Sequence, residues 1–289
     1  MAHVQFRILG PVEVWLDSRL TVPTGQPRAL LAALLLGANR VQELDWLVGA
    51  VWGDQPPPAA GDRIATQIAQ LRRMIGRRLV VVGANGSPGP DSTPRRRPHS
   101  GADAHRHGGS AGVGPADETV AGRAGYLLRV EPAQLDLLLF EETVTRARID
   151  MAARDYAAAS AGLRAALALW RGAPLSDVDS ALLREFEAPR LEEQRLSALE
   201  DRLEADLRLG RHAHVVEELR ALAAEHPLRE RFCRHLMIAL YRCRRRDAAL
   251  RAFSTAERTM RALGVIPGPS LRQLALAIRT DHPSLGPPS

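Results

Sequence analysis

Residues 62–77 carry two kinds of side chain at helical spacing, and one kind could contact nucleic acid. At about 100° per residue, the apolar residues of this stretch fall on one face of a helix. They are Ile64, Ile68, Leu71 and Ile75. The opposite face and its edges are polar, and comprise Arg63, Thr66, Gln67, Gln70, Arg73 and Arg77. One face could therefore pack on a domain while the other meets a partner.

The polar residue types suit double-stranded DNA. Gln can make paired hydrogen bonds to adenine, Thr can contact the thymine methyl group, and Arg can bind guanine or a phosphate. The polar residues from Arg63 to Gln70 lie toward the start of the helix, where side chains would reach the edges of bases. Arg73 and Arg77 lie later, where phosphate contacts are expected. The alternative is an amphipathic helix whose polar face is only solvated.

The flanking sequence predicts the elements that would position this helix. Apolar residues alternate over 4–8 and 12–16, which predicts short strands. Helical spacing predicts two helices before the polar one, near 28–37 and 44–52. GYLLRV at 125–130 predicts a returning strand. Short strands, three helices and a returning hairpin are typical of a winged helix, whose third helix enters the major groove.

Residues 83–122 are rich in Gly, Pro, Ser, His and Arg and almost lack large apolar side chains. Such a segment cannot bury enough surface to offset its ordering entropy, so it is predicted to be a disordered insertion before the wing. A surface insertion of this kind is tolerated because loop closure costs little. Two alternatives are nonspecific phosphate contacts through Arg95, Arg96 and Arg97, and translation of a misannotated or frameshifted stretch.

From Leu135 onward apolar residues recur at helical spacing with short breaks. A shift of 34 residues aligns Leu207 with Tyr241 and Leu219 with Phe253, and this is the period of the tetratricopeptide repeat. A generic helical bundle is the alternative. The predicted fold class is mainly α with a small β component. A winged helix-turn-helix domain over 1–130 precedes an all-α tetratricopeptide-like repeat domain over 131–289.

The charge is unevenly distributed along the 289 residues. All 39 basic residues are Arg, and the net charge is +6. Residues 1–130 contain 15 Arg and 10 acidic residues. Residues 131–289 contain 24 Arg and 23 acidic residues. The basic first half favours a polyanionic partner such as nucleic acid, with ordinary surface charge as the alternative.

Several classes of protein are disfavoured by what the sequence lacks. It has two cysteines without zinc spacing, no phosphate-binding loop of the GxxxxGK[ST] type, no leader pattern and no apolar run long enough for a membrane. We therefore expect no enzymatic activity, cofactor, metal or membrane contact, and a place in the cytoplasm with the nucleoid. The His pairs 105/107 and 212/214 are expected to be solvated, and Arg244–Arg246 to form a turn. Core positions are expected for Trp46, Trp52, Trp170, Cys233 and Cys243.

The chain resembles a known family in many stretches that occur in order. Its first half resembles the OmpR-like winged-helix domain, and its second half the bacterial transcriptional activation domain. Together they resemble the small type of Streptomyces antibiotic regulatory protein (SARP). The matching stretches include VQFRILGPVEV (4–14), LVGAVWGDQPPPAA (47–60), QIAQLRRMIG (67–76), ALALWRGAPLSDV (166–178) and LGVIPGPSLRQL (263–274).

The resemblance implies an activator of a secondary-metabolite gene cluster. Such an activator binds direct repeats in promoter DNA, associates with a second copy there and recruits RNA polymerase holoenzyme. The resemblance also implies a recognition helix over 63–77 and a wing over 123–130, with Arg123 and Tyr126 as DNA contacts. The polymerase-facing loop would contain Gly53, Asp54, Gln55, Pro56 and Pro57. The family often has His and Arg where this chain has Gln67 and Gln70, which leaves the half-site sequence open.

Two other functions stay open at the level of sequence. A protein-interaction adaptor would keep the repeat domain as a binding surface, while its winged helix no longer reads DNA. An enzyme or nucleotide-driven regulator is disfavoured, because no phosphate loop, metal cluster or nucleophile–base pattern occurs.

Overall fold

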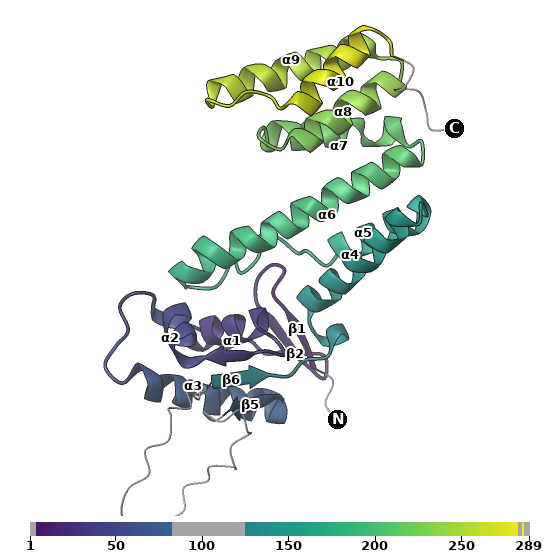
Figure 1. The fold of residues 1–289 in the computed structure, drawn as a ribbon. Coiled ribbons are helices and arrows are strands. Elements are labelled where there is room, and N and C mark those ends of the chain that lie inside the picture. The colour runs from purple at the N-terminus through teal and green to yellow at the C-terminus, as the bar shows by residue number, and fades with distance from the viewer. Residues whose placement is uncertain (1–3, 83–124, 283–284, 286–289) are drawn as a thin grey trace, which may run out of the picture.

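The computed structural model describes residues 4–82, 125–282 and 285 (Figure 1). The disorder predicted for 83–122 and the contacts predicted for Arg95, Arg96, Arg97 and Arg123 lie outside the described residues. Within the described part, no helix has the length and apolar character needed to cross a membrane. The same residues contain no group of three or more His, Cys, Asp or Glu that could hold a metal ion.

The chain begins with a three-stranded antiparallel sheet in the order β1-β2-β3. Its strands are β1 (Val4–Arg7), β2 (Glu13–Leu16) and β3 (Arg19–Leu20). Successive side chains of a strand point to opposite faces, so Val4 and Phe6 are buried while their neighbours are not. Phe6 lies opposite Val14, which is also buried. The alternation predicted for this segment is confirmed.

Three helices and a second sheet complete the N-terminal unit. The helices are α1 (Gln26–Leu36), α2 (Leu44–Trp52) and α3 (Ala60–Ile75). The second sheet has the order β4-β6-β5 and contains β4 (Val41–Glu43), β5 (Leu79–Val82) and β6 (Gly125–Leu128). Every residue of α1 from Ala29 to Leu35 is buried, so this helix forms the centre of the unit. The arrangement is that of a winged helix.

The second half of the described chain is helical and extends away from the N-terminal unit (Figure 1). Its elements are the single turn η2 (Pro132–Gln134), α4 (Asp136–Ala152), α5 (Tyr156–Leu167), the π-helical turn η3 (Leu183–Glu187), α6 (Ala188–Arg208), α7 (His212–Glu225), α8 (Glu230–Arg242), α9 (Arg246–Ala262) and α10 (Pro269–Arg279). Helices adjacent in the chain pack against each other, as in helical repeats. The predicted fold class is confirmed.

Hydrophobic packing does not stop at residue 130, where the secondary structure changes. One core cluster runs from Val4 to Ala198, and it joins both sheets to α4, α5 and the first half of α6. A second cluster runs from Leu196 to Ile278. The two clusters meet within α6, so the winged helix and the first helices share one core.

Two carboxylates also fasten the winged helix to the helical half. Asp136, at the start of α4, accepts hydrogen bonds from the backbone N–H of Ile8 at 2.8 Å and of Leu9 at 3.0 Å. Asp177 accepts from the Val12 N–H at 2.8 Å and pairs with Arg28 at 2.8 Å. Burial raises the pKa of Asp136, although these hydrogen bonds act in the opposite direction.

Candidate nucleic-acid interface

Helix α3 has the two faces that its sequence predicts. The side chains of its apolar face are at most 2% exposed, and they are Ile64, Ile68, Leu71 and Ile75. They belong to the first core cluster and hold the helix against the winged-helix unit. The helix ends after Ile75, where Gly76 has φ 74°, a conformation that L side chains rarely adopt. Most side chains of the opposite face are exposed.

Four of the five predicted contact residues that lie on α3 are exposed, namely Arg63, Thr66, Gln70 and Arg73. The Thr66 hydroxyl donates to the backbone carbonyl of Asp62 at 2.9 Å, as a helical Thr commonly does. Among the described residues, neither Arg63 nor Arg73 is paired with a carboxylate. Unpaired guanidinium groups on one helix face suit an anionic ligand such as a phosphate backbone.

Gln67 lies elsewhere than the sequence suggests. Its side chain is only 8% exposed, and its amide nitrogen donates to Gln26 Oε1 of α1 at 3.2 Å. A side chain at the edge of a helical face can point to solvent or into the domain, and the Gln67 side chain points into the domain. The structure therefore removes Gln67 from the outward face and makes it a link between α1 and α3. Arg77 follows the helix in η1 (Gly76–Arg78), and its side chain lies outside the described part.

The wing strand β6 lies between β4 and β5 in the second sheet of this unit. Tyr126 lies opposite Gln42 on β4 and Val81 on β5. Its ring is half-buried and packs on the first core cluster, and burial raises the pKa of its hydroxyl. A Cβ at Gly125 would lie 2.6 Å from the Gln42 carbonyl oxygen, so the strand pairing requires glycine there.

Asn39 fixes the position of this wing strand, and sequence analysis missed it. Its φ of 64° is left-handed, a conformation that Asn tolerates better than most residues. Its side chain donates to the Val130 carbonyl at 2.8 Å and accepts from the Val130 N–H at 2.9 Å. The two hydrogen bonds tie the turn after α1 to the end of β6. The sequence signal is an Asn two residues after Gly37, in the turn that ends the helix.

The loop between α2 and α3 projects from the winged-helix unit (Figure 1). Asp54, Gln55 and Pro56 are exposed, whereas Gly53 and Pro57 are half-buried. Gly53 ends α2 with φ 62°, and its N–H donates to the Gly49 carbonyl at 2.7 Å. The predicted loop residues therefore form one continuous surface segment beside α3.

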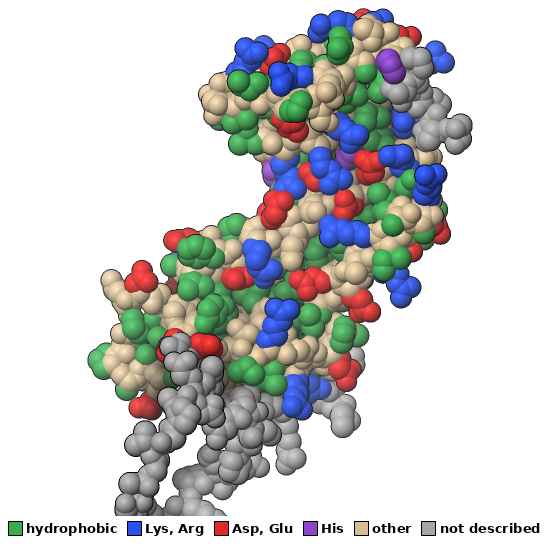
Figure 2. Space-filling model, in the orientation of Figure 1, with side chains coloured by type: hydrophobic (Ala, Val, Ile, Leu, Met, Phe, Trp, Pro, Cys, Tyr) green, Lys and Arg blue, Asp and Glu red, His purple; other side chains and the backbone are tan. Residues whose placement is uncertain are grey.

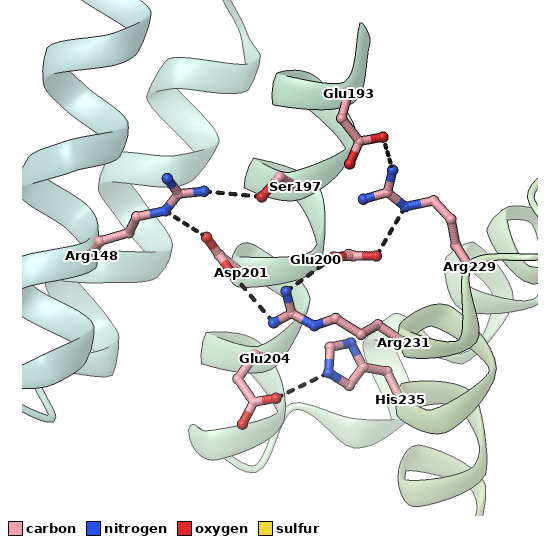
Figure 3. A network of polar contacts seen from close by, with 9 residues as sticks. All are labelled: Arg148, Glu193, Ser197, Glu200, Asp201, Glu204, Arg229, Arg231 and His235. Carbon is pink, nitrogen blue, oxygen red and sulfur yellow. Dashed lines mark hydrogen bonds and ion pairs between the residues drawn. The ribbon is translucent and has the colours of Figure 1, made fainter. Parts of the chain in front are cut away.

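The helical half neutralises many of its own charges. On the face seen in Figure 2, Arg and acidic side chains are interspersed over this half of the chain. Figure 3 shows four acidic residues of α6, namely Glu193, Glu200, Asp201 and Glu204, meeting basic residues from both sides. Arg148 of α4 pairs with Asp201 at 2.9 Å, and Arg231 of α8 pairs with Glu200 at 3.0 Å.

The same network includes a buried histidine. Arg229 contacts Glu193 and Glu200, and the fully buried His235 lies 3.0 Å from Glu204. The hydrogen bond with His235 lowers the pKa of Glu204 to about 2, against the opposing effect of burial and with help from Arg208. Sequence analysis missed this network, although its acidic residues lie at helical spacing on one side of α6. These charges are satisfied internally, unlike those on α3.

Comparisons with known proteins match nearly the whole chain. Residues 135–279 match the family described as "Bacterial transcriptional activator domain". The regulatory protein DnrI of Streptomyces peucetius is 35% identical over 98% of this chain and 94% of its own length. The chain belongs to the Streptomyces antibiotic regulatory protein family. This confirms the resemblance found in the sequence, and it makes the chain a transcriptional regulator.

Other relatives of this SARP-family chain are longer. The regulatory protein AfsR of Streptomyces griseus is 34% identical over 99% of this chain, which corresponds to 26% of AfsR. A solved structure of Mycobacterium tuberculosis EmbR, in complex with a low affinity phosphopeptide, superposes with a TM-score of 0.79 at 29% identity. That match covers 98% of this chain and 66% of EmbR. DnrI, AfsR and EmbR are all named as regulatory proteins.

Proposed function

We propose that this SARP-family chain activates transcription of a secondary-metabolite gene cluster by binding direct repeats in promoter DNA. The exposed face of α3 carries the proposal, because it combines residues that can read bases with unpaired Arg side chains. Arg63, Thr66 and Gln70 would contact base edges, and Arg73 would contact phosphates. Arg77, Arg123 and Tyr126 would add contacts at the end of the helix and on the wing. Gln67 is left out because it is buried.

The exposed loop after α2 would contact RNA polymerase holoenzyme. It lies on the same unit as α3 but carries no side chain predicted to read DNA. Replacing Asp54 and Gln55 together by Ala should therefore leave promoter binding unchanged and reduce transcription in a purified system. Equal transcription by the variant and the parent would remove this loop from the proposal.

The helical half would support association of two copies on the DNA. Its charge is nearly balanced, with 24 Arg against 23 acidic residues over 131–289, so it is not suited to tracking phosphates. Stacked helices instead offer a surface for a protein partner.

The test is a footprint and binding titration with the full-length protein on a promoter of its own cluster. Two direct repeats on one face of the duplex should bind cooperatively. Changing their spacing by half a helical turn places the copies on opposite faces and should abolish the cooperativity. Cooperativity that survives this change would contradict association on DNA. Absence of any specific footprint would contradict DNA recognition and leave a protein-interaction adaptor.

A further inference from the structure

A cavity of about 460 Å³ lies among α7, α8 and α9, far in the sequence from α3. Its volume falls within the range of about 300–1,000 Å³ that is typical of small-molecule sites. Helix α8 packs against both α7 and α9, and side chains of all three helices line the cavity. The residues proposed to bind DNA or polymerase are not part of it.

Most of the lining is apolar and much of it is small. Leu236 and Leu240 of α8 are buried and contribute the largest apolar side chains. The alanines are Ala223 and Ala224 from α7, and Ala248, Ala252 and Ala256 from α9. The three alanines of α9 recur every four positions, so they lie along one side of the helix. Because an alanine side chain ends at Cβ, this face leaves room for an elongated apolar body.

The charged residues of the lining are all Arg. Arg220 comes from α7, Arg245 precedes α9 and Arg251 lies on it, and the lining includes no Asp or Glu. Within the described part of the chain, the side chains of Arg245 and Arg251 have no hydrogen-bond or ion-pair partner. Arg220 pairs with Glu217 of its own helix at 3.1 Å, but both side chains are exposed and such a pair contributes little. The electrostatic preference is therefore for an anion.

Cys233 supplies a further part of the lining from α8. Burial, and to a lesser degree Glu230, raises the pKa of its thiol to about 12, so the group stays neutral at physiological pH. A neutral thiol behaves as a small apolar group and does not repel an anion.

We propose that this cavity binds a small organic acid with an elongated apolar body, whose carboxylate is held by Arg245 and Arg251. The apolar body would lie along the alanine face of α9 and against Leu236 and Leu240. Charge complementarity and the size of the cavity together identify this occupant.

The experiment uses the full-length protein and a fluorescent medium-chain fatty acid as the probe, with the methyl ester of the same compound as its uncharged counterpart. The acid should bind saturably and more tightly than the ester. The double variant Arg245→Gln/Arg251→Gln should weaken binding of the acid by about tenfold or more, because two charge-assisted hydrogen bonds are lost. Binding of the ester should not change.

The matched control is Arg244→Gln/Arg272→Gln, which removes the same charge from two exposed residues outside the lining. It should bind the acid like the parent. Ala252→Leu, which fills the cavity, should weaken binding of both acid and ester, and circular dichroism would verify that each variant is folded.

Three results would overturn the proposal. They are an absence of saturable binding of the acid, equal affinity for acid and ester, and an unchanged affinity in the folded Arg245→Gln/Arg251→Gln variant. An acidic amphipathic peptide that binds while the fatty acid does not would likewise overturn it and assign the cavity to a protein partner.

Discussion

Gln70 and Arg73 share the outward face of α3 but differ in the part of a DNA duplex that each can recognise. Gln70→Ala should relax the preference at one base position at a cost of about 1–3 kcal/mol. Arg73→Ala should weaken binding to all sequences and reduce the salt dependence, because a phosphate contact is lost. Binding titrations against single-base variants at several salt concentrations measure both effects.

Two exposed residues of α10, Gln273 and Arg272, provide matched controls for this pair. Their replacement by Ala should leave specific and nonspecific binding unchanged. If Gln70→Ala and Arg73→Ala also bind the specific site like the parent, α3 is not the recognition helix.

Glu204 makes the stability of the helical half depend on acidity. Its pKa falls from an ordinary value of 4.5 to about 2 in the fold, so the carboxylate stabilises the folded state above pH 4.5. This contribution is lost as the pH falls through about 2. The side chain is partly exposed, so we expect Glu204→Gln to lower the free energy of unfolding by only about 1–2 kcal/mol near pH 5.

Urea unfolding at a series of pH values measures this effect. The parent should lose stability between pH 4.5 and 2 more steeply than Glu204→Gln. Glu257→Gln removes a carboxylate that pairs with Arg261 within one helix, and serves as the control. Identical pH profiles for Glu204→Gln and the parent would contradict the role assigned to the His235 contact.

At the scale of elements, Gln67 shows how the core determines which side chains of α3 remain outside. Its Oε1 atom is buried without a hydrogen-bond partner among the described residues, so its amide contributes little net stability. Gln67→Met keeps the volume, and should change the free energy of unfolding by less than about 1 kcal/mol. Base preference should stay unchanged at every position. A changed preference in the same titrations would mean that this side chain turns outward on DNA.

The sequence predicted α3 and its two faces because its apolar residues repeat strongly at helical spacing. It also predicted β1, where apolar and polar residues alternate. It did not predict β4, whose three residues carry too little pattern and are held by pairing with β6. Nor could it give the direction of Gln67, because a residue at the edge of a helical face has two possible environments and only the position of α1 selects one.

At the scale of the whole molecule, the contacts that could not be predicted from the sequence are those between segments far apart in the chain. Asp136 and Ile8 are 128 residues apart, and no local pattern links them. Asp136→Ala would leave two buried backbone N–H groups without acceptors. Because each such group costs about 1–3 kcal/mol, we expect a loss of about 2–6 kcal/mol in the free energy of unfolding. Glu142→Ala, at an exposed position of α4, should have little effect.

Chemical unfolding followed by circular dichroism measures both variants. The shared core further predicts that Asp136→Ala lowers the stability of the β-containing unit and of α4 and α5 together. Loss of stability in the helices alone would contradict a single core that extends past residue 130.

The shared core also bears on how members of such a family could acquire new targets. If a winged helix were exchanged between relatives at residue 130, its part of the first core would have to pack against the helices of another protein. The backbone groups that pair with Asp136 and Asp177 would likewise meet the residues of that protein. Recombination at that point is therefore a costly route to a new operator. By contrast, Arg63, Gln70 and Arg73 are exposed, and their side chains make no hydrogen bond or ion pair with another element of the described chain. Point substitutions at these three positions could change the target while leaving the packing of the regulator untouched.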